Sequence, residues 1–306
     1  MRAMITGGTG FIGRKLVRAL IARGDEAVVV SRRASGGARP SEMEPAAELV
    51  GWDGIDRELA RTDAVFHLAG EPISDARWTP ERLSQLRTSR IGTTQTLAGA
   101  IGRATRRPRV WVSASAVGIY GMLGADALPT SEDGPVGDDV LARMCIDWES
   151  AADPARAMGV RVVHPRVGIV LGAGGGVFGK MVPAFRWGVG GPVGDGRQWV
   201  SWIHERDAVR ALLLLADRSD LAGPVNLVAP TPVTMAELAR ALGRAMHRPA
   251  ALAVPAFALR AVFGEGLARV LLTGQRAVPT ALLRAGFAFE HPGIDEALRQ
   301  LASELR

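Results

Sequence analysis

The stretch Ala3-Met-Ile-Thr-Gly7-Gly-Thr-Gly10-Phe-Ile-Gly13 joins a short apolar run to a glycine-rich turn at the start of the chain. The run predicts a strand over 3–6, and apolar residues at helical spacing after the turn predict a helix over 11–23. Glycines between such a strand and helix allow a tight turn, a close approach of a pyrophosphate and close helix packing. The helix N-terminus would offer free N–H groups to the phosphates. The residues expected to bind a dinucleotide here are Gly7, Thr9, Gly10, Phe11, Ile12 and Gly13.

The rest of the first 170 residues alternates short apolar runs with longer helical patterns. This alternation is typical of βαβ units and a parallel sheet. We therefore expect an α/β protein with a doubly wound parallel-sheet Rossmann fold. The further elements predicted in this part are strands over 27–30, 64–68, 110–113 and 160–163, and helices over 91–101 and 141–158.

After Pro165 glycine-rich loops and Pro/Gly breaks become frequent between the helical patterns. Within this part, the sequence predicts a helix over 205–216 and a strand over 225–228. This pair resembles one more helix–strand unit of the sheet. We expect a Rossmann domain over 1–165 whose sheet is completed by 204–229. The segments 166–203 and 230–306 are expected to form a smaller, mainly helical substrate lobe.

The end of the second predicted strand indicates which dinucleotide is bound. At this place an NAD site usually carries an acid that bonds the ribose 2′-hydroxyl. This chain has Ser31-Arg32-Arg33 instead, and Asp25 and Glu26 come before the strand. A carboxylate repels a 2′-phosphate, whereas a guanidinium holds it with charge-assisted hydrogen bonds. The alternative is that both arginines are ordinary surface residues, but the pattern favours NADP(H) bound by Ser31, Arg32 and Arg33.

Composition limits the class of protein. The chain has 306 residues, 47% of them hydrophobic, which is enough to bury a substantial core. The single cysteine, Cys145, suits a reducing cell interior. No run reaches the roughly 18 apolar residues of a membrane span, and no signal peptide is evident. A cytoplasmic location is therefore expected. The net charge of +6 comes from scattered arginines without a nucleic-acid motif. We expect a small-molecule substrate, and neither nucleic acid nor membrane as partner.

Further motifs follow the glycine-rich turn in a familiar order. His67-Leu-Ala-Gly70, Ser113-Ala-Ser115 with Tyr120-Gly121, and Arg166-Val-Gly-Ile-Val-Leu-Gly172 all recur in extended short-chain dehydrogenases/reductases. The chain resembles in particular an atypical, NAD(P)-dependent epimerase/dehydratase-like branch named epimerase family proteins, also labelled cell-division inhibitor homologues. The motifs that carry this closer resemblance are Ser89-Arg90, Trp148-Glu149, Gly190-Gly-Pro192, Trp202-Ile-His204, Gly274-Gln275 with Pro279, and Gly286-Phe287.

The resemblance implies a sugar-nucleotide-epimerase-like fold that binds NADP, without a settled substrate. It implies Leu68, Ala69 and Gly70 beside the adenine end of the ribose–pyrophosphate path. By the same resemblance Arg90 and Ser113 are further cofactor-binding residues, and Val170 lies near the nicotinamide end. The alternatives are that Leu68, Ala69 and Val170 are simply apolar ends of buried strands, and that Arg90 is an exposed helix residue.

The proton-transfer machinery of the resembling enzymes is missing. It requires a tyrosine four residues before a lysine, which lowers the pKa of the tyrosine. The only tyrosine is Tyr120, and neither lysine follows it at that distance. If Glu149 aligns with the acid that follows the usual motif, Leu141 and Cys145 occupy the two positions. Ser115 remains as a candidate catalytic hydroxyl. The alternative is that Ser115 is only a small residue at the end of a strand. Cys145 is expected to be a packed core residue.

His204 is the second candidate catalytic residue. It lies where epimerase-like proteins build the substrate pocket, and a pKa near neutrality would suit it as a proton donor. The favoured alternative is a local hydrogen bond at a helix start, with Asp207 in the first turn. The other histidines show no metal-ligand spacing, so no metal site is expected.

Two functions are compatible with these residues. The first is an NADP-dependent oxidoreductase or epimerase-like enzyme on a small, carbohydrate-like substrate, with Ser115 polarising a substrate oxygen. The second is a non-catalytic, redox-responsive NADPH-binding protein that acts through a protein partner. The helices over 91–101 and 141–158 carry enough apolar residues to permit a homodimer.

Overall fold

The computed structural model describes all residues except 37–39, 42 and 306. Its centre is a parallel sheet in the order β3-β2-β1-β4-β5-β7-β11, with the short β6 paired to β7. This confirms the predicted doubly wound fold. The strands are β1 (Arg2–Thr6), β2 (Glu26–Val30), β3 (Glu48–Val50), β4 (Ala64–His67), β5 (Val110–Ser113), β6 (Ser115–Ala116), β7 (Arg161–Val167) and β11 (Gly223–Leu227).

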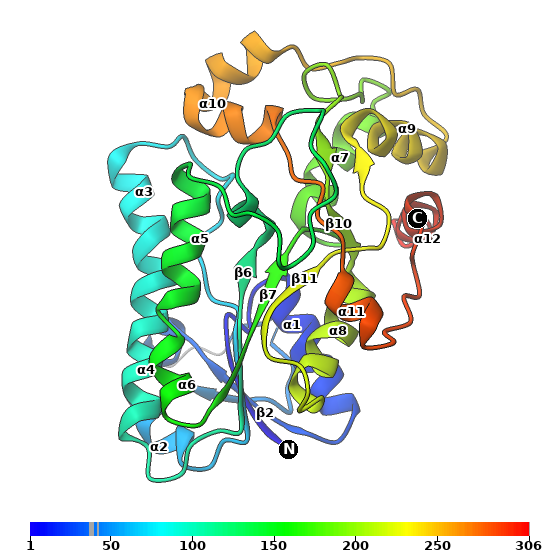
Figure 1. The fold of residues 1–306 in the computed structure, drawn as a ribbon. Coiled ribbons are helices and arrows are strands. Elements are labelled where there is room, and N and C mark those ends of the chain that lie inside the picture. Colours follow the sequence, from blue (N-terminus) through cyan, green and yellow to red (C-terminus); the bar gives the residue numbers. More distant parts are fainter. Residues whose placement is uncertain (37–39, 42, 306) are drawn as a thin grey trace.

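Helices cover both faces of the sheet (Figure 1). Alternate residues of a strand point to opposite faces, so Ile5 of β1 packs with one helical layer and Met4 with the other. The layer on Ile5 comprises α1 (Phe11–Ala22) and α8 (Glu205–Asp217). The layer on Met4 comprises α2 (Ile55–Leu59), α4 (Thr93–Arg103) and α6 (Asp153–Ala157).

Two further helices, α3 (Pro80–Arg87) and α5 (Val140–Ser150), extend the second layer; α3 was not predicted, and the two predicted helices in this layer have other bounds. α3 leads through a π-helical turn (Thr88–Gly92) into α4, so the predicted helix over 91–101 begins inside an irregular turn. The predicted helix over 141–158 is divided into α5 and α6. Pro154 lies in the first turn of α6, where its missing N–H is tolerated, but it cannot continue the hydrogen bonds of α5.

The C-terminal part adds helices and two small sheets around a separate apolar cluster. β8 (Ile169–Leu171) pairs with β10 (Trp202–His204), and β9 (Trp199–Val200) pairs with β12 (Val233–Thr234). Figure 1 shows this part beside the carboxyl edge of the central sheet. Its helices are α7 (Gly176–Arg186), α9 (Met235–Met246), α10 (Ala256–Leu272), α11 (Thr280–Arg284) and α12 (Ile294–Ser303).

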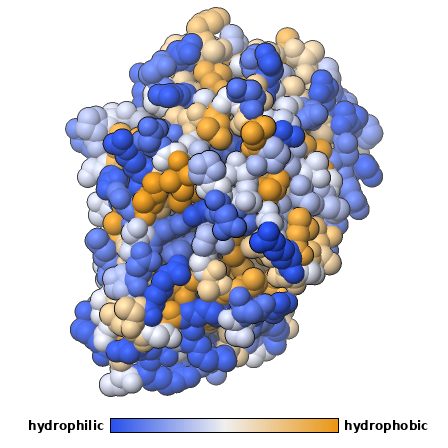
Figure 2. Space-filling model, in the orientation of Figure 1, coloured by the Kyte–Doolittle hydropathy of each residue, from blue (hydrophilic) through white to orange (hydrophobic). Residues whose placement is uncertain are grey.

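The surface carries apolar residues in separate groups. Figure 2 shows several hydrophobic patches among hydrophilic residues on the face drawn. The most exposed large apolar side chains of the described residues are Trp187, directly after α7, Leu128, in the segment before α5, and Phe257, in the first turn of α10. In the described part of the chain no helix is both long enough and apolar enough to cross a membrane.

Candidate functional site

A cleft of about 290 Å³ opens at the carboxyl ends of β1, β2 and β4. In a doubly wound sheet this edge is where ligands bind, because the connecting loops diverge there. The cleft brings together nine of the predicted cofactor residues with five others. Its lining residues are Gly7, Thr9, Gly10, Val30, Ser31, Arg32, Arg33, Trp52, Leu68, Ala69, Gly70, Glu71, Ser89 and Thr93.

The glycine-rich turn forms the floor of this cleft, and two glycines are required by space. Gly7 has a φ of 72°, and a Cβ there would lie 2.7 Å from the carbonyl carbon of Leu68. A Cβ on Gly13 would lie 2.1 Å from the Gly7 oxygen, so α1 packs directly on the turn. The helix begins at Phe11, after the N-cap residue Gly10, without a side-chain cap and without an acid in its first turn. Its first N–H groups therefore form a cradle suited to a diphosphate.

Basic side chains line the opposite end of the cleft, where β2 ends. Arg32 and Arg33 begin a 3-10 helix (Arg32–Gly36), and Ser31 Oγ accepts a hydrogen bond from the Arg33 N–H. The Arg32 side chain is 85% exposed and lies 3.3 Å from the Glu71 carboxylate. The position after β2 thus carries cations that suit a 2′-phosphate, and the residues of the cleft fit NADP(H).

Five lining residues were not predicted. Val30 is the last residue of β2, Trp52 follows the short β3, and Glu71 directly follows the predicted Gly70. Ser89 and Thr93 lie one helical turn apart. Ser89 Oγ accepts a hydrogen bond from the Glu71 N–H, and Thr93 Oγ1 lies 3.3 Å from Nε2 of His67, the last residue of β4. Glu71 alone carried a usable signal, because it is a polar residue just after a buried strand. Ser89 and Thr93 lie on the π-helical turn and at the start of α4, and no strand end marks them.

Some predicted cofactor residues lie beside the cleft without lining it. The Phe11 ring lies under the 172–176 loop, where a Cβ on Gly175 would come within 2.6 Å of it. Gly13 lies beneath the turn, and Val170 is buried in the core between the sheet and α1. The Ser113 hydroxyl is buried and lacks a hydrogen-bond partner among the described residues. For Phe11, and for Ile12 next to it, only the backbone N–H groups at the start of α1 remain as candidate ligands of a phosphate.

The structure places Arg90 behind the cleft instead of in it, and only 8% of it is exposed. The alternative of an exposed helix residue is therefore wrong. Its guanidinium donates to the Glu71 carbonyl at 2.9 Å and lies over the Trp148 ring at 5.3 Å. Burial lowers the pKa of this guanidinium. These contacts give Arg90 a positioning role, because they hold the segment that follows β4 against the π-helical turn.

Leu141 and Cys145, which occupy the positions of the missing tyrosine–lysine pair if Glu149 aligns with the usual acid, are buried. Leu141 and Cys145 lie on α5, and Cys145 packs with Val117 and Tyr120. Burial, reinforced by the nearby Glu149, raises the pKa of the Cys145 thiol to about 12, so it is protonated at neutral pH.

Tyr120 does not replace the missing acid. Its hydroxyl donates to Asn226 Oδ1 at 2.7 Å and accepts from Arg166 at 3.1 Å, and burial raises its pKa. Ser115, at the start of β6, is 2% exposed, and its Oγ has no hydrogen-bond partner among the described residues. Ser115 is thus a buried hydroxyl whose hydrogen-bonding capacity the described protein groups leave unused.

His204 does not line the cleft. It caps α8, where its Nδ1 accepts from the Arg206 N–H at 3.1 Å, and its Nε2 lies 2.8 Å from Gln300 Oε1. Its ring stacks on His291 at 3.8 Å, and burial lowers its pKa to about 4. Both nitrogens are therefore used in local structure, which favours the capping alternative over the proton donor.

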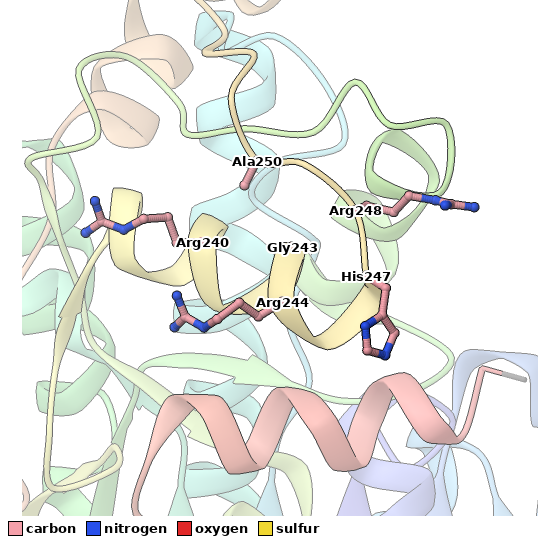
Figure 3. Close-up of a pocket in the computed structure, with 6 residues that line it drawn as sticks. All are labelled: Arg240, Gly243, Arg244, His247, Arg248 and Ala250. Atoms are coloured by element: carbon pink, nitrogen blue, oxygen red, sulfur yellow. The ribbon is translucent and has the colours of Figure 1, made fainter.

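A second cavity, of about 500 Å³, lies at the C-terminal end of α9 and is rich in basic residues. Figure 3 shows that these side chains fan away from the helix in different directions. Arg244 pairs with Asp295 at 2.6 Å, and Arg248 donates to the Arg186 carbonyl. They do not converge on one point as an anion site requires. The lining residues are Arg240, Gly243, Arg244, His247, Arg248 and Ala250.

The comparisons with known proteins agree with this geometry. Residues 3–227 match the model of the NAD dependent epimerase/dehydratase family. The chain belongs to that family. Residues 254–301 match a second model, described as a domain of unknown function, DUF1731. The family model covers the sheet with its cleft, and the second covers α10, α11 and most of α12.

Relatives within the epimerase/dehydratase family extend the likeness over the whole chain. An epimerase family protein of Mycobacterium bovis is 42% identical over 96% of this chain and 95% of its own. The epimerase family protein SDR39U1 of Bos taurus is 40% identical over 98% and 99%. The crystal structure of human SDR39U1 with NADPH has a TM-score of 0.87, with 37% identity over 99% of both chains. These matches confirm the resemblance to epimerase family proteins.

Proposed function

We propose that this protein binds NADPH and uses it in oxidoreductase or epimerase-like chemistry on a small, carbohydrate-like substrate. The observation that carries the cofactor assignment is Ser31-Arg32-Arg33 at the rim of the cleft, where a site for NAD would carry an acid. Its support from outside the chain is the human relative SDR39U1, which matches 99% of both chains and whose structure contains NADPH.

In this proposal each part of the cleft holds one part of the cofactor. The N–H groups at the start of α1, including those of Phe11 and Ile12, bind the diphosphate, and Arg32 and Arg33 bind the 2′-phosphate. Leu68, Ala69 and Gly70 line the path between them. When bound, the cofactor supplies or accepts a hydride.

The proposal assigns Ser115 to the substrate. Its buried hydroxyl would donate to a substrate oxygen and polarise the carbonyl that the reaction forms or consumes. Neither Tyr120 nor Cys145 takes over proton transfer, because the first is held by Arg166 and Asn226 and the second has a pKa of about 12. The proton of a substrate hydroxyl would therefore be exchanged with water or with another group of the substrate.

Ser115→Ala tests this assignment. We expect turnover to fall about 100-fold, the size of effect found when one donor to a developing oxyanion is removed. NADPH affinity should stay within about twofold, and Cys145→Ala should retain activity because the thiol takes no part. The readout is NADPH consumption against a panel of small aldehydes, ketones and sugars. Turnover by Ser115→Ala equal to that of the unmodified protein would remove the serine from the mechanism.

Arg32→Ala tests the cofactor assignment. Loss of one charge-assisted contact to the 2′-phosphate should weaken NADPH binding about 10- to 100-fold. NADH lacks this phosphate, so its affinity should change less than twofold. Fluorescence titration of the nucleotide-free protein measures both. An equal loss for the two nucleotides would show that Arg32 does not contact the 2′-phosphate.

A second candidate function is a non-catalytic NADPH-binding protein that signals redox state to a protein partner. It is favoured by two buried residues, Leu141 and Cys145, at the positions that the alignment through Glu149 gives to the usual acid and base. It predicts NADPH binding without turnover for any member of the panel. A cytoplasmic location and a homodimer through α4 and α5 stay predictions, which fractionation and light scattering test.

A further inference from the structure

An ion pair joins the two sides of the cofactor cleft at its outer end. Arg32 comes from the loop after β2 and Glu71 from the segment after β4, and both line the cleft. Arg32 Nη2 and Glu71 Oε1 are 3.3 Å apart. The carboxylate therefore contacts the guanidinium that, under the proposed function, receives the 2′-phosphate.

Glu71 is placed there by its own backbone. Its N–H donates to Ser89 Oγ at 3.1 Å, and its carbonyl accepts from Arg90 Nη2 at 2.9 Å. Arg90 is buried between Gly70 and the Trp148 ring, so this attachment point has little freedom. The carboxylate is thus presented to the cleft by a segment that the π-helical turn fixes.

Glu71 has a second cationic neighbour, which differs from the first. Arg82 Nη1 lies 3.8 Å from Glu71 Oε2, and the Arg82 side chain is only 15% exposed. Arg82 also donates to the Pro72 carbonyl and to Gln85, so it stays in place. Arg32, in contrast, is 85% exposed and free to turn. Glu71 retains a fixed partner when Arg32 leaves it.

We propose that Glu71 is an internal competitor for Arg32 that sets the affinity for NADPH. The inference rests on the proposed function, since it concerns the same cleft. In the structure Glu71 pairs with the Arg32 guanidinium. The 2′-phosphate of NADPH displaces Glu71 from Arg32, because the phosphate has more charge and three acceptor oxygens. Glu71 then remains paired with Arg82. NADH has no group that competes for Arg32, so the Arg32–Glu71 ion pair remains formed when NADH binds.

The opposite role for Glu71 would be to hold Arg32 ready for the phosphate. The two roles predict opposite signs. If Glu71 prepares the site, neutralising it weakens NADPH binding because Arg32 loses its anchor. If Glu71 competes, neutralising it strengthens NADPH binding because Arg32 is then released to the phosphate. Exposed pairs are weak and easily exchanged, which favours competition.

Glu71→Gln decides between them, because glutamine keeps the size of the side chain and removes its charge. We expect NADPH to bind about three- to tenfold more tightly and NADH to change less than twofold, by fluorescence titration at low salt. The matched control is Asp75→Asn, which removes an acid of the same segment that pairs with Lys180 at 2.7 Å. It should leave both affinities unchanged.

The effect must also depend on Arg32. In an Arg32→Ala background, Glu71→Gln should alter NADPH affinity less than twofold, because the contested group is absent. Weaker or unchanged NADPH binding by Glu71→Gln in the otherwise unmodified protein overturns the inference, as does an equal gain in the Arg32→Ala background. If the unmodified protein has no preference for NADPH, the proposed function itself fails. A clear preference without a response to Glu71→Gln leaves that function standing and removes only the competitor.

Discussion

Gly13→Ala is expected to weaken NADPH binding at least about tenfold and to lower the free energy of unfolding by about 1–3 kcal/mol. The added Cβ would lie 2.1 Å from the Gly7 oxygen and 2.8 Å from Gly8 Cα. Both contacts are with backbone, so α1 must move away from the turn. The N–H groups at its start would then no longer match the positions of the phosphates, and displacements of about 1 Å are costly in such sites. NADPH titration and thermal unfolding measure the two effects.

The matched control is Gly179→Ala. Gly179 is an exposed residue of α7, and a Cβ there meets nothing within 4 Å. Alanine should stabilise the helix slightly, by up to about 1 kcal/mol, and leave NADPH binding unchanged. Normal NADPH affinity in Gly13→Ala would contradict the assignment of the phosphates to this turn.

Glu149→Gln is expected to be the most destabilising of the substitutions considered, by about 3–5 kcal/mol. Glu149 holds Arg166 with two hydrogen bonds, of 2.9 and 3.0 Å, and the Arg166 side chain is 7% exposed. The remaining Arg166 contacts, to Tyr120 and the Glu132 carbonyl, are neutral. Removing the carboxylate charge leaves a buried cation uncompensated between β7 and α5. The midpoint of thermal unfolding should fall by about 10 °C.

Asp147→Asn is the control for this prediction, because it removes an acid of the same helix. Asp147 pairs with Arg87 at 2.6 Å, but both side chains are 47% exposed. Water screens such a pair, and its loss should cost less than about 1 kcal/mol. Equal stability of Glu149→Gln and Asp147→Asn would show that the buried pair contributes no more than a surface one.

The sequence predicts the cofactor cleft well because its central parts are local. The Gly7–Gly13 turn lies between adjacent elements, and Ser31-Arg32-Arg33 directly follows a run of four apolar residues that reads as a buried strand. Gly70, which the family resemblance implied, also lies shortly after a strand, three residues beyond the end of β4. At each of these places, a strand end and the next few residues determine which groups meet the ligand.

Other contributions depend on the tertiary fold. Trp52 follows a strand of three residues, which is too short to show a pattern. Ser89 and Thr93 reach the cleft because a π-helical turn joins α3 to α4, and nothing in the hydropathy pattern marks that turn. Arg90 looks like an exposed helix residue in the sequence, and only packing against Trp148 makes it a buried one. The Glu71–Arg32 pair joins two loops that the sheet brings together.

The preference of the cleft for NADPH is tested most directly by the ratio of the NADPH and NADH dissociation constants for the unmodified protein stripped of nucleotide. Titration followed by the fluorescence of the reduced nicotinamide gives both at one salt concentration. We expect NADPH to bind at least about tenfold more tightly, because the 2′-phosphate contacts Arg32 and Arg33. Equal affinity for the two nucleotides, tighter binding of NADH, or binding of neither would contradict it.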